Sequence, residues 1–371
     1  MRKSLCRYLP VSLLFIFLAL ILWTCGGGGD GGGGPQPAFS QTDLAGTWDF
    51  LELDTGNSFG WARANVSVDG SGNITLNNFA DSSGFNYPGP PFDVFTKWVI
   101  DGSGTIRQYD TDTTPNILSP SLYGSLASNK GLAVVTDNDS SFTYTLIVVR
   151  KRDASVVFGN SDIRGRTFVY HQLYAGTDNV WEYGYGSIDV SGNVTIDNVI
   201  GPSGPSPGYP QIVDTIAVDS AGIVTNADNT FYGMLTADKS TLFGLITEPL
   251  NPNPRDRLIV IQFLGQTYAQ TDLAGKWRFH VLYGWNSPGW VKGSWTIDAA
   301  GAATYDDFLT DFGITVPPTT PEVLTLASDG IISNSVSPTY HGMMSAGKDL
   351  YVRTRSSGTA PVRYSIGISV K

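Results

Sequence analysis

Small or apolar residues alternate with polar residues along short segments of this chain. The segment ARANVSV at Ala62–Val68 has apolar residues at positions 62, 64, 66 and 68 and polar residues at 63, 65 and 67. A period of two is typical of a β-strand with one buried face. Similar short runs recur to the end of the chain, and no amphipathic helical pattern follows residue 24. The pattern therefore predicts an all-β protein.

Glycines mark the turns between the expected strands. Five of the six turn glycines follow an Asp by three positions, as Gly72 follows Asp69. An Asp at the first position of a type I turn accepts backbone N–H groups, and Gly at the fourth position tolerates a left-handed conformation. We therefore expect β-hairpins with a structural turn glycine at Gly72, Gly104, Gly192, Gly222, Gly301 and Gly330.

One phrase in the sequence occurs twice, and a weaker copy lies between the two. QTDLAGTWDF occupies residues 41–50 and QTDLAGKWRF residues 270–279, while NSDIRGRTFV occupies residues 160–169. The turn glycines recur at similar distances from each copy, so a unit of about 110 residues is repeated. We expect three β repeats, at residues 40–152, 159–268 and 269–371.

Each unit has room for eight strands. In the first unit we expect strands near 46–53, 61–68, 73–79, 94–100, 105–109, 122–127, 132–136 and 142–150. An opening Gly-x-Trp strand before an eight-stranded meander resembles the calycin superfamily of lipocalins and avidin-like proteins, on the residues Gly46-x-Trp48 and Gly275-x-Trp277. The resemblance implies closed antiparallel barrels with the Trp at the closed end. Thr167 stands where the middle unit would have this Trp, and no avidin-type ligand residues can be placed.

A second architecture fits the same hairpins. Each unit holds two hairpins with an Asp-x-x-Gly or related turn, so three units could form one six-bladed β-propeller. A propeller commonly closes its ring by sharing strands between the chain ends, whereas the third unit ends at its own last strand. The sequence therefore favours three tandem eight-stranded barrels over one propeller.

The first 24 residues have the layout of an export signal. Arg2, Lys3 and Arg7 precede the apolar run VSLLFIFLALILW, and Cys25 follows it. The stretch LWTC at residues 22–25 resembles the lipobox of bacterial lipoproteins, which implies a lipidated Cys25 and membrane attachment through that lipid. The Gly-rich residues 26–37 then form a flexible tether. In that family Gly26 does not signal inner-membrane retention, so we expect an outer-membrane lipoprotein that faces the periplasm or the cell surface. An uncleaved N-terminal membrane helix is the alternative.

Cysteine usage and charge exclude several classes of site and partner. The only cysteines are Cys6, within the signal, and Cys25, so disulfides and cysteine-based metal sites are excluded from the folded part. Removal of the signal lowers the number of Lys and Arg from 23 to 20, against 33 Asp and Glu, which gives a balance of −13. Such a surface is unsuited to nucleic acid.

The sequence contains little catalytic chemistry. The three histidines are His171, His280 and His341, which we expect to be exposed or partly packed. No nucleophile elbow, paired-histidine zinc pattern or phosphate loop is present. The acidic clusters at 110–114 and 137–141 lack the EF-hand pattern and are interpreted as solvated loops rather than calcium sites. We therefore expect no enzyme activity, no cofactor and no metal.

Three tryptophans occupy equivalent positions, eight residues before a turn Asp: Trp61, Trp181 and Trp290. In an unbroken strand each would face away from the apolar row of its barrel. Exposed rings at these positions would bind a carbohydrate or a small apolar ligand. The alternative is that each strand bends and its Trp caps its own barrel.

Two functional classes follow from these observations. The first is a non-catalytic envelope protein that binds a glycan or small apolar ligand through three repeated sites, for which repetition provides avidity. The second is a structural or adhesive surface protein without a small-molecule site. An envelope hydrolase is the third alternative.

Overall fold

The computed structural model describes residues 38–371 except residue 90 and the segments 112–115, 177–179, 249–254, 285–286, 318–321 and 358–361. The expected export signal, Cys25 and the Gly-rich tether to residue 37 lie outside the described residues. The described chain consists of β-strands and three short 3₁₀ helices, η1 (Gln41–Asp43), η2 (Asn160–Asp162) and η3 (Gln270–Leu273). In this part of the chain no helix is long and apolar enough to cross a membrane.

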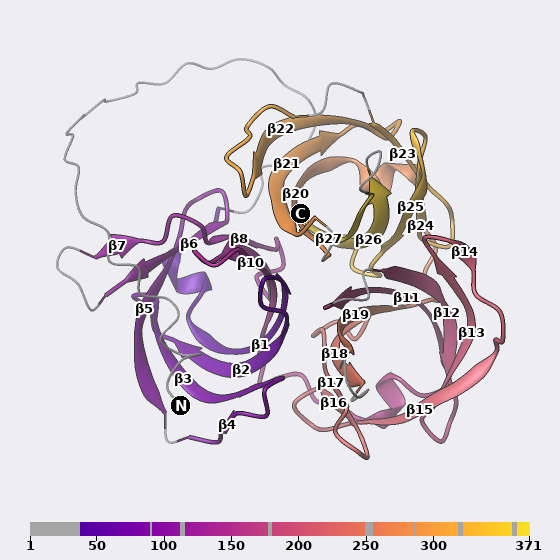
Figure 1. The fold of residues 1–371 in the computed structure, drawn as a ribbon, viewed down its shortest axis with the longest axis horizontal. Helices are drawn as coiled ribbons and strands as arrows, with labels where there is room; N and C mark the ends of the chain where they lie inside the picture. Colours follow the sequence, from indigo (N-terminus) through magenta and orange to yellow (C-terminus); the bar gives the residue numbers. More distant parts are fainter. Residues whose placement is uncertain are drawn as a thin grey trace. The chain divides into compact units, whose positions relative to one another are not determined.

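The first repeat is a closed antiparallel barrel of eight strands in chain order (Figure 1). The first strand pairs with both the second and the last, which closes the sheet. Two short strands, β4 (Asn86–Tyr87) and β7 (Ile117–Leu118), pair with strands of the barrel. The eight barrel strands are β1 (Gly46–Gly56), β2 (Gly60–Val68), β3 (Asn73–Asp81), β5 (Phe92–Ile100), β6 (Thr105–Asp110), β8 (Tyr123–Leu126), β9 (Leu132–Asn138) and β10 (Thr143–Lys151).

The second and third repeats form barrels with the same order of strands. The second contains β11 (Arg166–Ala175), β12 (Trp181–Ile188), β13 (Asn193–Gly201), β15 (Gln211–Val218), β16 (Ile223–Asn226), β17 (Phe231–Leu235), β18 (Thr241–Glu248) and β19 (Arg255–Phe263), with the short β14 (Gly204–Pro205) beside β13. The third contains β20 (Gly275–Tyr283), β21 (Gly289–Ile297), β22 (Ala302–Thr310), β23 (Glu322–Leu326), β24 (Ile331–Asn334), β25 (Ser337–Met344), β26 (Leu350–Ser357) and β27 (Arg363–Val370).

The prediction of three eight-stranded barrels is confirmed, and the propeller alternative is wrong. Each unit closes its sheet on itself by pairing its own first and last strands. Propeller blades instead stay open and are arranged around a central channel. In the first unit every expected strand end lies within three residues of the observed one.

The repeated phrase builds a plug at one end of each barrel, which we call the closed end. In the first unit Leu44 is fully buried beneath the barrel, and the Gln41 side chain donates to the carbonyl of Trp98 at 2.8 Å. The Asp of the phrase pairs with a Lys in the turn before the seventh barrel strand, as Asp43 pairs with Lys130 at 3.0 Å. The equivalent pairs are Lys239–Asp162 at 2.9 Å and Lys348–Asp272 at 2.7 Å.

The large ring at the closed end is present in all three barrels. The indoles of Trp48 and Trp277 donate to the carbonyls of Leu44 and Leu273, each at 2.7 Å. In the second barrel this place is taken by Phe168 and not by Thr167. Arg166 pairs with Ile188 in the same way as Gly46 pairs with Val68 in the first barrel, so Arg166 is equivalent to Gly46. Phe168, two residues after Arg166, is therefore equivalent to Trp48, two residues after Gly46. The alignment of Thr167 with the two tryptophans was therefore one residue out of register.

The six turn glycines all have positive φ, between 80° and 98°. At the first turn the Asp69 carboxylate accepts the N–H groups of Ser71 and Asn73 at 2.8 and 2.9 Å. A Cβ at Gly72 would collide with the carbonyl oxygen of Trp98 on the next strand. This glycine is therefore required both by its backbone conformation and by the close approach of another strand.

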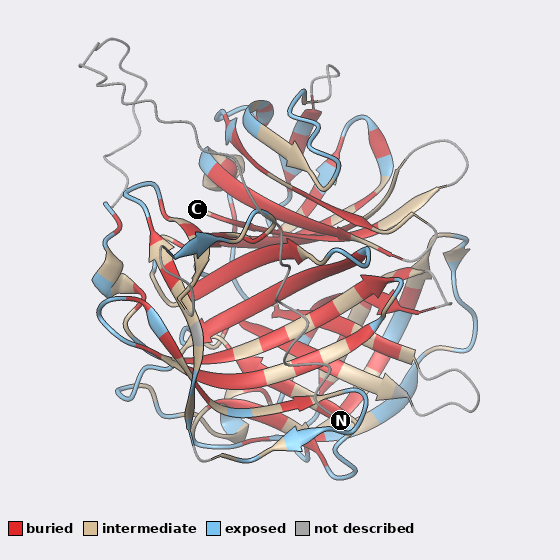
Figure 2. Ribbon diagram, turned by 60° about the vertical axis from the view of Figure 1, so that its left-hand side comes forward, coloured by how far each residue is buried: buried red, intermediate tan, exposed pale blue. Residues whose placement is uncertain are grey.

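The three barrels contact one another through equivalent strands. The first two strands of each barrel contact the last two strands of another: β1 and β2 contact β18 and β19, β11 and β12 contact β26 and β27, and β20 and β21 contact β9 and β10. Such head-to-tail interfaces form a closed ring when the rotation closes. A hydrophobic cluster with residues from all three barrels fills these interfaces, separate from the three barrel interiors. Figure 2 shows the buried residues concentrated in the strands.

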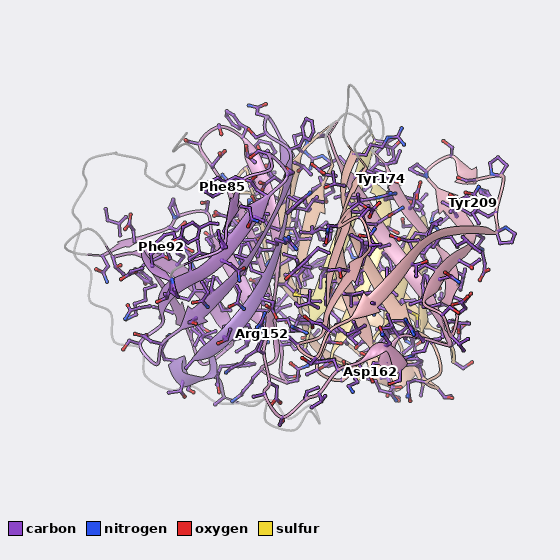
Figure 3. The ribbon with its side chains drawn as sticks, turned by 90° about the horizontal axis from the view of Figure 1, so that it is seen from below. Phe85, Phe92, Arg152, Asp162, Tyr174 and Tyr209 are labelled. Atoms are coloured by element: carbon purple, nitrogen blue, oxygen red, sulfur yellow. The ribbon has the colours of Figure 1, made fainter. Side chains whose placement is uncertain are left out.

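The three barrels lie side by side, with their closed ends on the same side of the molecule. In Figure 3, Phe85 of the first barrel and Tyr174 of the second lie on the upper side, while Asp162 at the closed end of the second lies on the lower side. We call the ends opposite the plugs the open ends. The contact between Phe59 and Gly176, both in loops at the open ends, agrees with this arrangement, because a Cβ at Gly176 would lie 3.0 Å from the Phe59 ring.

Buried arginines complete two of the three interfaces. Arg150 of the first barrel pairs with Asp49 and donates to the carbonyls of Leu235 at 2.7 Å and Ala221 at 2.9 Å in the second barrel. Arg152, labelled in Figure 3, is the second partner of Asp49, at 2.7 Å. Arg278 of the third barrel donates to the carbonyls of Ser103 and Leu126 in the first.

Candidate functional site

The interiors of the three barrels differ in chemistry towards their open ends. In the first barrel Glu52, Asp54 and Asp137 point inward, and the Thr145 hydroxyl donates to Asp54 at 2.5 Å. Burial and the nearby Asp54 raise the pKa of Glu52 well above its usual value, and burial raises the pKa of Asp137 to about 6. Among the described residues no group of His, Cys, Asp or Glu could hold a metal ion.

This acidic interior changes the interpretation of one loop cluster. Of the cluster at 137–141, Asp139 caps its own turn by accepting the N–H groups of Ser141 and Thr143, each at 2.9 Å. Asp137 is buried instead of solvated. The cluster at 110–114 lies largely outside the described residues.

Aromatic rings fill the interior of the second barrel. Tyr170 packs against Gly184, where a Cβ would lie 2.8 Å from the ring. Further along, the Gln172 amide donates to Glu182, and Arg257 donates to the Tyr174 hydroxyl at 2.6 Å. Polar side chains of this interior therefore bond to one another.

The third barrel contains a cavity of about 350 Å³ at its open end. Alternate residues of β20 point into it because successive side chains of a strand face opposite sides. Most of its wall is aromatic or aliphatic, and the polar remainder comes from β23, β26 and β27. The lining residues are Phe279, Val281, Tyr283, Val291, Tyr305, Phe308, Glu322, Val336, Arg353, Arg355, Ser357 and Ser365.

Two arginines of β26 line this cavity, and among the described residues only one of them makes an ion pair. Arg355 pairs with Glu322 at 3.2 Å, and Glu322 also accepts the amide of Asn334 at 2.7 Å. Arg353 is only 7% exposed, and among the described residues it makes no ion pair and no side-chain hydrogen bond. Its guanidinium lies over the ring of Tyr340, 5.4 Å from the centroid. Within the described part of the chain Arg353 therefore makes no ion pair of its own, because the nearby Glu322 carboxylate, whose charge favours the charged form of Arg353, is paired with Arg355.

Glycines leave space for two side chains of this interior, Arg353 and Phe279. A Cβ at Gly367, the residue paired with Arg353 on β27, would lie 3.1 Å from the Arg353 Nε. On β21, a Cβ at Gly293 would lie 2.7 Å from the Phe279 ring. Gly367 thus leaves room for the Arg353 guanidinium inside the barrel.

The phenols around the cavity are neutral hydrogen-bond donors. Burial raises the pKa of Tyr340 to about 12 and raises the pKa of Tyr305 and Tyr351 further. They therefore add no negative charge to offset Arg353 near neutral pH.

The three sequence-predicted tryptophans lie between barrels. Trp181 and Trp290 are 1% and 2% exposed, and Trp61 is partly buried against the same inter-barrel cluster. The indole of Trp181 donates to Ser356 at 2.8 Å, that of Trp290 donates to Asn138 at 2.9 Å, and that of Trp61 donates to Thr247. Each Trp thus faces out of its own barrel, as its position in the strand predicts, and packs on the next barrel.

Two histidines are more deeply buried than the sequence suggested. His280 of the third barrel contacts the Ser125 and Thr136 hydroxyls of the first at 2.9 and 3.1 Å. His171 of the second barrel contacts Thr354 of the third at 3.3 Å. Burial lowers the pKa of both histidines to about 3, so both are neutral at pH 7. The half-buried His341 stacks on Tyr183, with 4.8 Å between the ring centroids.

Sequence reasoning missed the two cavity arginines. The signal was present, because Arg353 and Arg355 are two residues apart in a predicted strand and share one face. A comparison of units by strand pairing places Val135 of the first barrel and Gly244 of the second at the position of Arg353. The repeats are therefore alike in fold and different in interior chemistry.

No protein-family model and no curated protein match this chain. Among solved structures, a transferrin binding protein B from serogroup B Neisseria meningitidis has 9% identity and a TM-score of 0.25, with 88% of this chain and 75% of that chain covered. A double mutant of the Haemophilus parasuis protein of that name has 7% identity and a TM-score of 0.30, with the same coverage. A putative outer membrane protein from Bacteroides fragilis has 13% identity and a TM-score of 0.17, with 60% and 98% covered. Likeness at these TM-scores supports no conclusion about function, so the functional argument depends on the site itself.

Proposed function

We propose that this protein is a non-catalytic, envelope-anchored protein that binds a small ligand inside its third barrel. The observation that carries the proposal is the cavity of about 350 Å³ beside the unpaired, buried Arg353. Its volume falls at the lower end of the range of about 300–1,000 Å³ that is typical of small-molecule sites. An apolar wall with a few convergent polar groups is also typical of such sites.

The site is single rather than repeated three times. The equivalent interiors hold interacting carboxylates in the first barrel and packed rings in the second. The other two barrels support the third, since the three share one inter-barrel hydrophobic cluster. The proposal therefore replaces threefold avidity with one site inside the third barrel.

The ligand site is tested with two probes of equal chain length, octanol and octanoate. Binding of either probe should raise the melting temperature of the whole chain and change its Trp fluorescence, because a ligand stabilises the state that binds it. The variant Val291→Phe, which fills the cavity, should lose both effects. The control Val190→Phe changes an exposed turn residue of the second barrel and should respond like the wild type. If neither probe affects the wild type, the structural or adhesive alternative is favoured.

The membrane attachment is a separate part of the proposal. Cys25 carries the lipid, supported by the apolar run, the lipobox-like LWTC and the Gly-rich tether. Labelling of cells with palmitate should mark the wild type and the control Cys6→Ser, and it should not mark Cys25→Ser. Equal labelling of both variants would contradict lipidation at Cys25. Fractionation of the labelled cells tests whether the protein resides in the outer membrane.

A further inference from the structure

The polar end of the third-barrel cavity is rich in hydrogen-bond donors. Arg353 and Arg355 both line the cavity, and the Nε of each is buried without a partner among the described residues. A guanidinium has five N–H donors and no acceptor. A ligand group that satisfies this end of the cavity must therefore accept hydrogen bonds.

The charge balance of the cavity fixes the charge of that group. Arg353 and Arg355 contribute two positive charges, and Glu322, which pairs with Arg355, contributes one negative charge. Burial of an uncompensated charge is costly, and a single opposite charge beside Arg353 would remove that cost. A group with two negative charges would leave an excess of negative charge in the same space.

The fold itself does not require an arginine at this position. Val135 and Gly244 occupy the equivalent positions in the other two barrels, which close in the same way. Arg353 therefore carries a cost of burial without a structural need within the barrel. Functional sites are where such costs are tolerated.

The remaining wall determines the rest of the ligand. Phe279, Phe308 and Val281 line the apolar part of the cavity. Near the open end, Phe312, Ile314 and Val316 follow β22 as exposed apolar side chains. A chain that extends from Arg353 towards the open end would lie against apolar surface along its length.

From these observations, and resting on the proposed function, we infer that the third barrel binds a monoanionic carboxylate with a short apolar chain. The carboxylate accepts hydrogen bonds from the Arg353 guanidinium, a geometry in which two parallel N–H···O bonds can form. The apolar chain lies among the rings of β20 and β22.

The test compares octanoate, octanol and octyl phosphate by calorimetric titration of the whole chain. Wild type should bind octanoate at least about tenfold more tightly than octanol, since only the carboxylate forms charge-assisted hydrogen bonds with Arg353. Octyl phosphate should bind more weakly than octanoate. Equal binding of octanol and octanoate, or tighter binding of octyl phosphate, would overturn the inference and leave the proposed function standing. Binding of none of the three would instead reject the proposed function.

A variant separates a ligand-binding arginine from a structural one. Arg353→Met should lose the preference for octanoate over octanol, and its melting temperature without ligand should rise, because an unpaired buried charge has been removed. The matched control Arg164→Gln removes one positive charge from the second repeat and should keep the preference. A lower melting temperature for Arg353→Met together with an unchanged preference would show that the arginine is structural. If Arg353→Met does not fold, the wild-type preference still tests the inference.

Discussion

The interior position of Arg353 in the third barrel holds Val135 in the first and Gly244 in the second. The next inward position on the same strand holds Arg355, Asp137 and Ile246 respectively. These residues share a backbone environment, so their side chains alone set the charge of each interior. At the residue scale the three barrels therefore differ more than their common fold suggests.

The carboxylates of the first barrel should lower its stability at high pH. Burial raises the pKa of Asp137 to about 6, above its value of about 3.9 in an unfolded chain. The associated stability is present below pH 3.9 and is lost as the pH rises through 6. Asp137→Asn should therefore raise the free energy of unfolding by about 2–3 kcal/mol at pH 8, and by little at pH 4.

Urea unfolding at the two pH values measures this effect. The control Asp197→Asn changes an exposed carboxylate on β13 and should alter stability by less than about 0.5 kcal/mol. A loss of stability in Asp137→Asn at pH 8 would show that the carboxylate is better satisfied than its burial suggests.

At the scale of strands, burial on one face or on both faces explains why buried and exposed residues alternate along some strands and not along others. β2 alternates in its polarity, whereas β10 is buried at eight successive residues, from Thr143 to Arg150. One face of β10 lines the barrel interior, and the other packs on the third barrel. The unbroken apolar run near the end of the first unit is thus a consequence of contacts between barrels.

The first hairpin turn offers a matched test of its two glycines. Gly72→Ala should destabilise the protein by more than about 1 kcal/mol, because a Cβ is disfavoured at φ 93° and would collide with the Trp98 carbonyl. Gly70→Ala, two residues earlier, introduces a Cβ with no atom within 4 Å and should be close to neutral. Chemical denaturation of the two variants measures the difference. Equal stabilities would contradict the turn geometry.

At the scale of the whole molecule, three related interfaces close one ring, and their chemistry differs. His280 meets two hydroxyls on the first barrel, whereas Leu51, its equivalent in the first barrel, belongs to the apolar inter-barrel cluster. At the position of Thr136 the second barrel has the apolar Leu245, so a third barrel placed against the second would lose this hydroxyl partner of the histidine. Mismatched polar groups of this kind favour one order of barrels over others.

The inter-barrel tryptophans should contribute strongly to stability. Trp290→Ala removes a ring that is 2% exposed and leaves Asn138 of the first barrel without its donor. We expect a loss of about 3–5 kcal/mol, as for other large aromatic residues truncated in cores. Thermal unfolding of the whole chain measures it, with Phe142→Ala, an exposed loop residue, as the nearly neutral control. An unchanged melting temperature for Trp290→Ala would show that this interface contributes little.

The sequence by itself determined the all-β class, the three repeats, the strand positions and the turn glycines, because these depend on local periodicity and on backbone conformations that only glycine tolerates. For Trp61, Trp181 and Trp290 it left two alternatives open, a position facing out of the barrel and a cap on the same barrel. Only the tertiary structure decided what the three rings contact. The alternation of side chains along a strand shows on which side of the sheet a residue lies, but it does not show which other part of the protein packs there. Likewise, Arg353 could be assigned to a face, but the pairing of Glu322 with Arg355 rather than with Arg353 depends on β23, β26 and β27, which are brought together only when the barrel closes.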